Sequence, residues 1–296
     1  MKVQANGIAF EVEDRPAPGE PRGTVLLVMG LGMQLIAWPP ALLDALAADG
    51  FRVICFDNRD CGLSTCLDGL GAPNLPLAAL RQRLGFALRP PYTLADMAAD
   101  ALGVLDALQV QRAHVVGVSM GGMIAQRLAL AAPQRVASLS SIMSSSGARK
   151  LPGPRPAALR ALFSRPKGRG EEAVVRHTLG LLRAIGSPGF PADPIAQRAQ
   201  VQRAVQRSFT PAGTLRQMLA VMADGRRADE LPRIAVPTLV VHGKDDPLVP
   251  LACGEDTARR IPGARFVAVA GMGHDLPPGV VDMLLAPLLS HLRSHP

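Results

Sequence analysis

Six strand-length runs of nearly uninterrupted apolar residues recur along this 296-residue chain, and they constrain its fold more than any other feature. The runs occupy residues 24–30, 52–57, 113–119, 136–144, 237–243 and 264–271. A strand that is apolar at both odd and even positions is buried on both faces, as in a parallel sheet covered by helices. Helical patterns fall between the runs, at residues 40–49, 94–108, 121–132, 253–260 and 280–293. This alternation predicts an α/β fold with a mostly parallel central sheet flanked by helices.

The N-terminal residues and the start of one helix carry further local signals. Residues 1–16 alternate apolar and polar side chains around Asn6-Gly7, a dipeptide typical of hairpin turns. Thr93 and Asp96 have the spacing of a capping box at the start of helix 94–108. No apolar run reaches the ~18–20 residues that span a bilayer, and the N-terminal pattern does not resemble a secretion signal. We therefore expect a cytoplasmic protein with no integral membrane segment.

The alternation stops between residues 147 and 229, where helical patterns are separated by Pro and Gly and no strand is evident. Within this segment Leu215, Met218, Leu219 and Met222 form one apolar stripe, which is most commonly core packing. An insertion of this length is better described as a helical cap than as a loop. We predict a core formed by residues 1–146 and 230–296 and a helical cap formed by residues 147–229, which covers the C-terminal edge of the sheet.

The positive charge of the chain is concentrated in the same segment. The chain carries a formal net charge of +8, and residues 147–230 hold 15 Lys or Arg against six Asp or Glu. Such an asymmetry can indicate binding to nucleic acid or to an anionic membrane surface. Here the arginines are dispersed among helical apolar positions and are not interleaved with aromatic residues, so we expect solvated helical faces and no nucleic-acid partner. A basic cap could instead favour anionic substrates if any arginine faces inward.

The four cysteines, Cys55, Cys61, Cys66 and Cys253, have no zinc-binding spacing. We expect free thiols, because a structural disulfide is uncommon in a reducing compartment. Nothing in the sequence indicates a metal ion or a cofactor.

Ser119 stands where a strand is expected to give way to a helix, in the stretch HVVGVSMGGM. Gly117 and Gly121 flank it at two residues on either side, and Gly122 follows. Gly-x-Ser-x-Gly between a strand and a helix is the pattern of a nucleophile elbow, a sharp turn that exposes the serine oxygen. Glycines fit there because side chains would collide where strand and helix approach closely. The turn would leave the Met120 N–H free to face a developing oxyanion. The alternative is an ordinary tight turn.

The order of elements and this motif resemble the α/β-hydrolase superfamily over nearly the whole chain. The resemblance implies a catalytic serine, acid and histidine in that chain order. The stretch PTLVVHGKDDPLVP offers two acids after a late strand, and the family position selects Asp246, with Asp245 as the alternative. The stretch GMGHDLP, after the last strand, matches the family's G-x-G-H pattern and selects His274 as the base. The weaker histidine candidates are His114, His177, His242, His291 and His295.

The same resemblance implies a second oxyanion donor in the loop after strand 24–30. Many relatives carry His-Gly there, and this chain has Met29-Gly30, which places the donor at the backbone N–H of Leu31. Because the donor belongs to the backbone, the replacement of His by Met need not remove it.

A third stretch, DNRDCGLS at residues 57–64, resembles the family's D-x-R-G-x-G-x-S loop, with Asp60 in place of the usual glycine. We interpret this loop as structural bracing, with Arg59 as an ion-pair anchor. Together with VMG and Trp38-Pro39, it is similar to a capped esterase subgroup that includes methylesterases acting on polyketide-derived esters.

These residues predict a serine hydrolase that needs no cofactor and cleaves a small-molecule carboxylic ester through Ser119, His274 and Asp246, with an acyl-enzyme intermediate. Cofactor-free haloperoxidase-like chemistry and carbon–carbon bond hydrolysis use the same triad in this superfamily and stay open. A receptor that kept the fold but binds its ligand without turnover is the non-enzymatic alternative. A homo-oligomer also stays open.

Overall fold

A single eight-stranded sheet runs through the structure, a computed structural model that describes residues 1–295. The strand order is β1-β2-β4-β3-β5-β6-β7-β8. The strands are β1 (Lys2–Ala5), β2 (Ile8–Arg15), β3 (Gly23–Val28), β4 (Phe51–Phe56), β5 (Ala113–Val118), β6 (Val136–Ile142), β7 (Thr238–Gly243) and β8 (Arg265–Val269). β1 and β2 form the predicted hairpin around Asn6-Gly7, β2 pairs antiparallel with β4, and the remaining strands are parallel.

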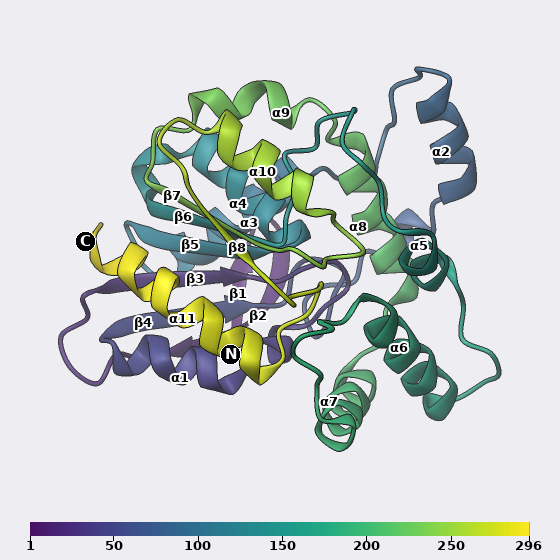
Figure 1. Cartoon of the computed structure of the whole chain (residues 1–296), viewed down its shortest axis with the longest axis horizontal. Helices are drawn as coiled ribbons and strands as arrows, with labels where there is room; N and C mark the ends of the chain where they lie inside the picture. Colours follow the sequence, from purple (N-terminus) through teal and green to yellow (C-terminus); the bar gives the residue numbers. More distant parts are fainter. Residues whose placement is uncertain (296) are drawn as a thin grey trace.

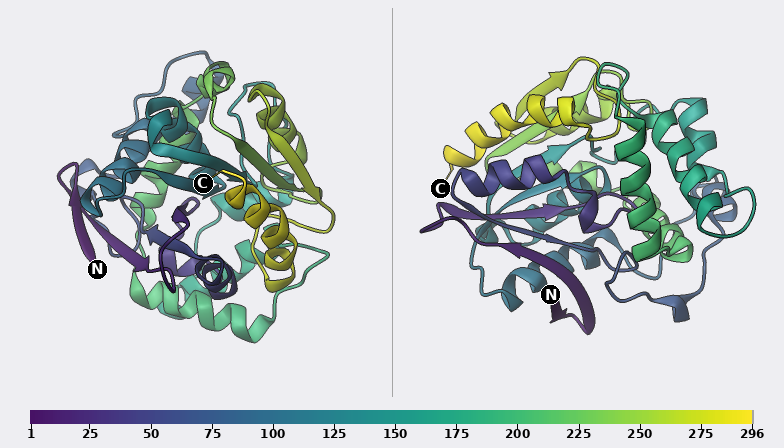
Figure 2. Two further views of the ribbon diagram at one scale, coloured as in Figure 1. Left: turned by 90° about the vertical axis from the view of Figure 1, so that its left-hand side faces the viewer. Right: turned by 90° about the horizontal axis from the view of Figure 1, so that it is seen from below.

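Helices cover both faces of this sheet (Figures 1 and 2). The helices are α1 (Pro40–Ala48), α2 (Leu75–Arg83), α3 (Leu94–Ala107), α4 (Met120–Ala131), α5 (Pro156–Phe163), α6 (Glu171–Ile185), α7 (Pro194–Arg207), α8 (Pro211–Ala223), α9 (Arg227–Glu230), α10 (Leu251–Arg260) and α11 (Pro278–Arg293). α1 and α11 pack on one face, and α3, α4 and α10 lie on the other. The predicted α/β architecture is therefore confirmed.

The two faces of the sheet carry two separate apolar cores. Every residue of β5, β6 and β7 is buried, as the continuous apolar runs predicted. On one face Ile124 and Leu128 of α4 are almost fully enclosed, and on the other face Leu284 and Leu288 of α11 are equally buried. Burial of such side chains contributes roughly 1.5–3 kcal/mol each, so the two cores hold the sheet rigid beneath the loops at its C-terminal edge.

The strand ends and one helix differ from the sequence predictions. The run 136–144 stops as a strand at Ile142, because Met143 has a φ of 42° and cannot continue an extended chain. Helix α2 was not predicted. The side chain of Asn74 caps this helix by accepting from the Leu77 N–H. The helix packs on α8, a contact that no local sequence pattern predicts.

The predicted capping box of α3 is confirmed, with reciprocal hydrogen bonds between Thr93 and Asp96. All four cysteines are free thiols, as expected. Burial raises the pKa of the Cys55 thiol to about 12 and also raises that of Cys61, so these sulfurs behave as apolar core groups. No helix among residues 1–295 has the length and apolar character needed to cross a membrane.

Between β6 and β7 the chain forms five helices, α5 to α9, most of which gather at one end of the sheet (Figure 1). We call residues 147–229 the inserted segment. In the apolar stripe of α8, Met218 and Leu219 are buried in a small cluster with Leu75 and Ala78 of α2. The stripe therefore forms a packed apolar contact between α8 and α2, as the sequence analysis predicted.

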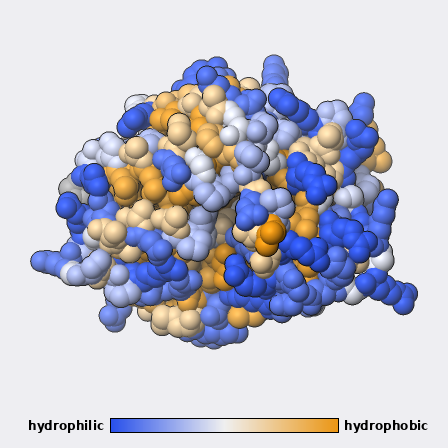
Figure 3. Space-filling model, turned by 60° about the horizontal axis from the view of Figure 1, so that its bottom comes forward, coloured by the Kyte–Doolittle hydropathy of each residue, from blue (hydrophilic) through white to orange (hydrophobic). Residues whose placement is uncertain are grey.

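The expectation of solvated arginine faces is wrong for part of the inserted segment. Arg216 and Arg227 have exposed fractions of 0% and 1%. Arg216 pairs with Asp60, and Arg227 pairs with Asp224. Each buried cation already has a carboxylate partner, which burial requires, so neither is available to bind an anionic substrate. The exposed arginines and lysines lie mainly on α5, α6, α7 and the nearby loops, and the side of the molecule where these helices lie is largely hydrophilic in Figure 3.

The Asp60–Arg216 pair joins the inserted segment to the core. Asp60 has a φ of 65°, a left-handed conformation that glycine adopts more readily than other residues. Its two carboxylate oxygens accept from Arg216 at 2.7 Å each, and they also accept from the Tyr92 hydroxyl and the Leu67 N–H. Burial opposes ionisation of Asp60, but these hydrogen bonds outweigh it, and its pKa lies below the ordinary value.

An Arg216→Met variant is expected to lose about 3–5 kcal/mol of unfolding free energy, because it leaves the Asp60 carboxylate buried without a cationic partner. Adding Asp60→Gly should recover most of this loss, since both buried charges are then absent and glycine tolerates the positive φ. Urea denaturation of the two variants measures the difference. A double variant as unstable as the single one would contradict this account of the pair.

Candidate active site

Ser119 occupies a strained turn between β5 and α4. Its φ and ψ are 55° and −121°, a conformation that is rare for a residue with a side chain. A Cβ on Gly117 would lie 2.2 Å from the Gly121 carbonyl oxygen, and one on Gly121 would lie 2.0 Å from the Val28 carbonyl oxygen. The flanking glycines are therefore required by backbone packing around the serine, and the side chain of Ser119 is left at the sheet edge.

His274 and Asp246 form a hydrogen-bonded line with Ser119. The His274 Nε2 atom lies 3.0 Å from Ser119 Oγ, and Nδ1 lies 2.7 Å from Asp246 Oδ2. The His274 and Asp246 residues have exposed fractions of only 8% and 3%. With Nδ1 protonated and donating to the carboxylate, Nε2 is an acceptor that can take the serine proton. The fold thus brings together the three residues that the sequence selected.

The two adjacent acids in the turn after β7, Asp245 and Asp246, bond to different groups. Asp246 accepts from His274 through Oδ2 and from the N–H groups of Leu248 and Val249 through Oδ1. Asp245 instead accepts from the Gly271 N–H at 2.8 Å. The geometry favours Asp246 as the partner of His274, and Asp245 braces the loop that leads to it.

The remaining histidines do not approach Ser119 in this way. His242 is fully buried, its Nε2 lies 2.7 Å from the Val249 carbonyl oxygen, and burial lowers its pKa, so a neutral ring stands beside Asp246. His114 and His291 are buried in the cores, where burial lowers the pKa of each to about 4. These rings serve packing and local hydrogen bonding.

The two expected oxyanion donors border Ser119. Met120 is the first residue of α4, so its N–H has no carbonyl one turn earlier within the helix. Gly30, next to Leu31, approaches so closely that a Cβ there would lie 3.2 Å from the Ser119 Cβ. Among the described residues, no acceptor is found for the Leu31 N–H. Both N–H groups therefore stay candidates for binding an oxyanion.

The sequence analysis missed the residues that hold these loops in place. Gln217 of α8 accepts from the Gly32 N–H at 2.8 Å. The Ile185 carbonyl at the end of α6 accepts from the His274 N–H at 2.7 Å, and the Ser187 hydroxyl bonds to the Gly273 N–H. A glutamine on a helix and a backbone carbonyl carry no local signal, so the sequence alone could not reveal them.

The described part of the chain contains no group of three or more His, Cys, Asp or Glu side chains placed to hold a metal ion. The chemistry that the arrangement supports is proton transfer from Ser119 Oγ to His274 Nε2 while a carbonyl carbon is attacked. The imidazolium that forms is stabilised by Asp246, and the oxyanion by backbone N–H groups.

Comparison with known proteins identifies the family of this chain. A profile of the alpha/beta hydrolase fold family matches residues 23–277. The chain belongs to this family. Among similar proteins, a rhodomycin D methylesterase from a Streptomyces species is 32% identical, and the match covers 91% of each chain. A putative carbamate hydrolase from Variovorax paradoxus is also 32% identical, with 82% of this chain and 80% of the relative covered.

A solved structure of another protein has the same α/β-hydrolase fold. The enol-lactonase from Burkholderia xenovorans superposes with a TM-score of 0.71 at 23% identity, and the match covers 99% of this chain and 100% of the other. At that level of identity the likeness concerns the fold.

Proposed function

We propose that this α/β-hydrolase cleaves carboxylic esters with Ser119 as nucleophile, His274 as general base and acid, and Asp246 as the group that orients His274. The observation that carries the proposal is the line from Ser119 Oγ through the His274 ring to Asp246, with distances of 3.0 and 2.7 Å. An alcohol, an imidazole and a carboxylate in this order form the recurrent apparatus of acyl transfer.

The reaction would proceed in two balanced stages. Ser119 Oγ attacks the ester carbonyl carbon while its proton passes to His274 Nε2, and the oxyanion binds the N–H groups of Leu31 and Met120. The tetrahedral intermediate collapses, and His274 gives its proton to the departing alkoxide, which leaves as an alcohol. A water molecule then gives a proton to His274 and attacks the acyl-enzyme, and Ser119 regains that proton when the carboxylic acid departs.

A methyl ester is the substrate class that we favour. The similarity to the methylesterase extends over 91% of both chains, and the stretches VMG, Trp38-Pro39 and DNRDCGLS point the same way. A carbamate is the second candidate, because the carbamate hydrolase relative is equally identical over a somewhat shorter match. The same nucleophile, base and oxyanion donors would serve either carbonyl compound.

We also propose that the inserted segment, residues 147–229, acts as a helical cap over Ser119. Its α6 end contacts the His274 loop, and α8 contacts the loop that carries Leu31. Substrate selection would then depend on α6 and α8, since these helices border both catalytic loops.

A matched pair of substrates tests the proposal. Purified protein should hydrolyse a methyl ester and a short p-nitrophenyl ester faster than the corresponding carbamate. A fluorophosphonate probe should label Ser119, as peptide mass spectrometry would report. Faster carbamate turnover would select the second candidate. Folded protein that neither reacts with the probe nor hydrolyses any of these compounds would overturn the hydrolase proposal and favour the receptor alternative.

A further inference from the structure

Gln217 of α8 joins the inserted segment to the loop that follows β3. Its side-chain carbonyl oxygen accepts from the Gly32 N–H at 2.8 Å, and its amide donates to the Arg59 carbonyl oxygen at 2.7 Å. Gln217 has an exposed fraction of 0%. A buried amide with both ends satisfied is fixed in one orientation, because rotation would leave a polar atom without a partner.

The surrounding contacts fix the same loop from the same side. Gly32 has a φ of 65°, and a Cβ there would lie 2.8 Å from Thr214 Oγ1, so the loop backbone rests directly on α8. A second anchor comes from the core, where Asn58 donates to the Met29 carbonyl oxygen at 3.0 Å. Leu31 lies between these two anchors, at Met29 and Gly32, and its neighbour Gly30 is the residue that approaches Ser119.

From this arrangement we infer that Gln217 is a positioning residue for catalysis: it sets the direction of the Leu31 N–H through the neighbouring Gly32. The inference rests on the proposed function, since it assumes that Leu31 donates to the oxyanion. Oxyanion stabilisation depends on donor placement within a few tenths of an ångström, so a small movement of this loop reduces it. The inserted segment would then contribute to the rate as well as to substrate selection.

Replacing Gln217 by Met removes both hydrogen bonds at nearly constant side-chain length. Loss of a whole oxyanion donor costs about 10²–10³ in kcat, and displacement of one should cost about 10–100-fold. The KM should change little. The affinity for a trifluoromethyl ketone, which adds to Ser119 and carries an oxyanion, should fall by the same factor as kcat/KM.

Two further variants keep the test decisive. Gln206→Met changes an exposed glutamine on α7 that bonds only to Glu171, and it should behave as wild type. Gln217→Glu keeps the acceptor for Gly32 but, when ionised, cannot donate to Arg59. Its kcat deficit relative to wild type should therefore narrow at low pH, where the carboxyl group regains a proton.

Active-site titration with the fluorophosphonate counts the folded sites in each preparation. Unchanged kcat and analogue affinity in Gln217→Met and Gln217→Glu, or an equal loss in Gln206→Met, would overturn the positioning role. If wild-type protein is inactive and unlabelled, the proposed function itself fails. If wild type is active and the Gln217 variants match it, only this inference fails.

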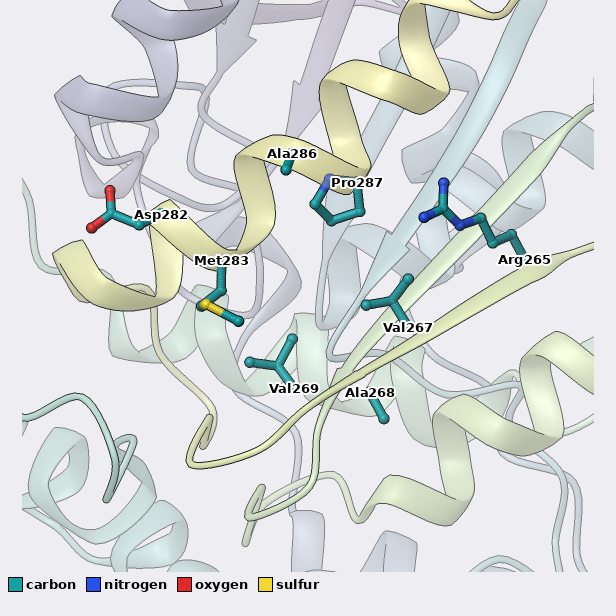
Figure 4. Close-up of a pocket in the computed structure, with 8 residues that line it drawn as sticks. All are labelled: Arg265, Val267, Ala268, Val269, Asp282, Met283, Ala286 and Pro287. Atoms are coloured by element: carbon teal, nitrogen blue, oxygen red, sulfur yellow. The ribbon is translucent and has the colours of Figure 1, made fainter.

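A separate observation concerns the outer edge of the sheet at β8. A groove of about 460 Å³ lies between β8 and α11, and Arg265 stands at one end of it and Asp282 at the other (Figure 4). Its apolar lining includes Val267, Val269 and Met283, and Met283 is 50% exposed. Among the described residues, neither Arg265 nor Asp282 has an ion-pair partner within 4 Å.

The backbone of β8 leaves alternate groups unpaired at this edge. The Val269 carbonyl accepts from the Lys244 N–H on the β7 side. Because hydrogen bonds alternate along a parallel strand, the N–H and C=O groups of Phe266 and Ala268 point outward. An edge strand of this kind is a template for pairing with another strand.

We propose that the β8 edge pairs with β8 of a second copy of this chain across a two-fold axis at Val267. Antiparallel pairing about that residue would join Phe266 to Ala268 of the second copy. It would also bring Arg265 beside Val269 of the second copy. Asp282 of the second copy lies at that end of its groove (Figure 4). The unpaired charges are therefore self-complementary, as a two-fold interface requires.

Sedimentation velocity of the full chain tests this interface. Wild type should be a dimer at tens of micromolar, and Ala268→Pro, which removes one outward N–H, should be a monomer. Arg265→Glu should weaken dimerisation by about tenfold or more, and adding Asp282→Arg should restore it. Arg203→Glu, on the exposed face of α7, is the charge-matched control. Monomeric wild type, or a dimer that persists in both Ala268→Pro and Arg265→Glu, would overturn the proposal.

Discussion

A Ser119→Ala variant should lose about 10⁴–10⁶ in kcat for ester hydrolysis, because it removes the oxygen that forms the acyl-enzyme bond. The KM for a slow substrate should stay close to wild type, since the methyl group fills most of the same space. Hydrolysis of a p-nitrophenyl ester, followed by release of the phenolate, measures the loss. Circular dichroism and thermal denaturation should show an unchanged fold.

The same assay, applied to a double variant, shows whether Ser119 and His274 act together or independently. Nucleophile and base act as one unit, so His274→Ala should cost about as much as Ser119→Ala, and the double variant should cost little more. Independent contributions would multiply in the double variant. Unchanged turnover in Ser119→Ala would show that the nucleophile lies elsewhere.

The second large effect is expected at Asp246. An Asp246→Asn variant should lower kcat about 10⁴-fold, because the amide can donate to Nδ1 and favour the wrong tautomer of His274. The Leu248 and Val249 N–H groups that now bond to Oδ1 could still bond to the amide oxygen, so the loop should keep its shape. Steady-state kinetics of the purified variant provide the measurement.

Asp245→Asn is the matched control for that result. It makes the same chemical change one residue earlier, on a side chain that accepts from Gly271 and does not contact His274. Its kcat should remain near that of wild type. A collapse of activity in Asp245→Asn, with little effect in Asp246→Asn, would reverse the assignment of the acid.

The fold was largely predictable because local patterns and global packing agree. Continuous apolar runs become strands buried on both faces, and Asn6-Gly7 makes the expected hairpin. Helix α2 was not predicted, because its apolar residues find their partner on α8, more than 130 positions away in the chain. The fate of Arg216 was also mispredicted, since a charged residue on a helix is exposed unless tertiary contacts supply a partner such as Asp60.

By itself the sequence determined which residues lie at the candidate site. Gly117 is required for a steric reason that acts within five residues, since a Cβ there would meet the Gly121 carbonyl oxygen, and Asp246 and His274 follow strands whose ends must meet at one sheet edge. Only the tertiary structure decided what holds that site. Gln217 and the Ile185 carbonyl reach the catalytic loops through hydrogen bonds between segments far apart in the chain. Such bonds depend on the relative position of two packed elements, and no periodicity or local motif encodes that position.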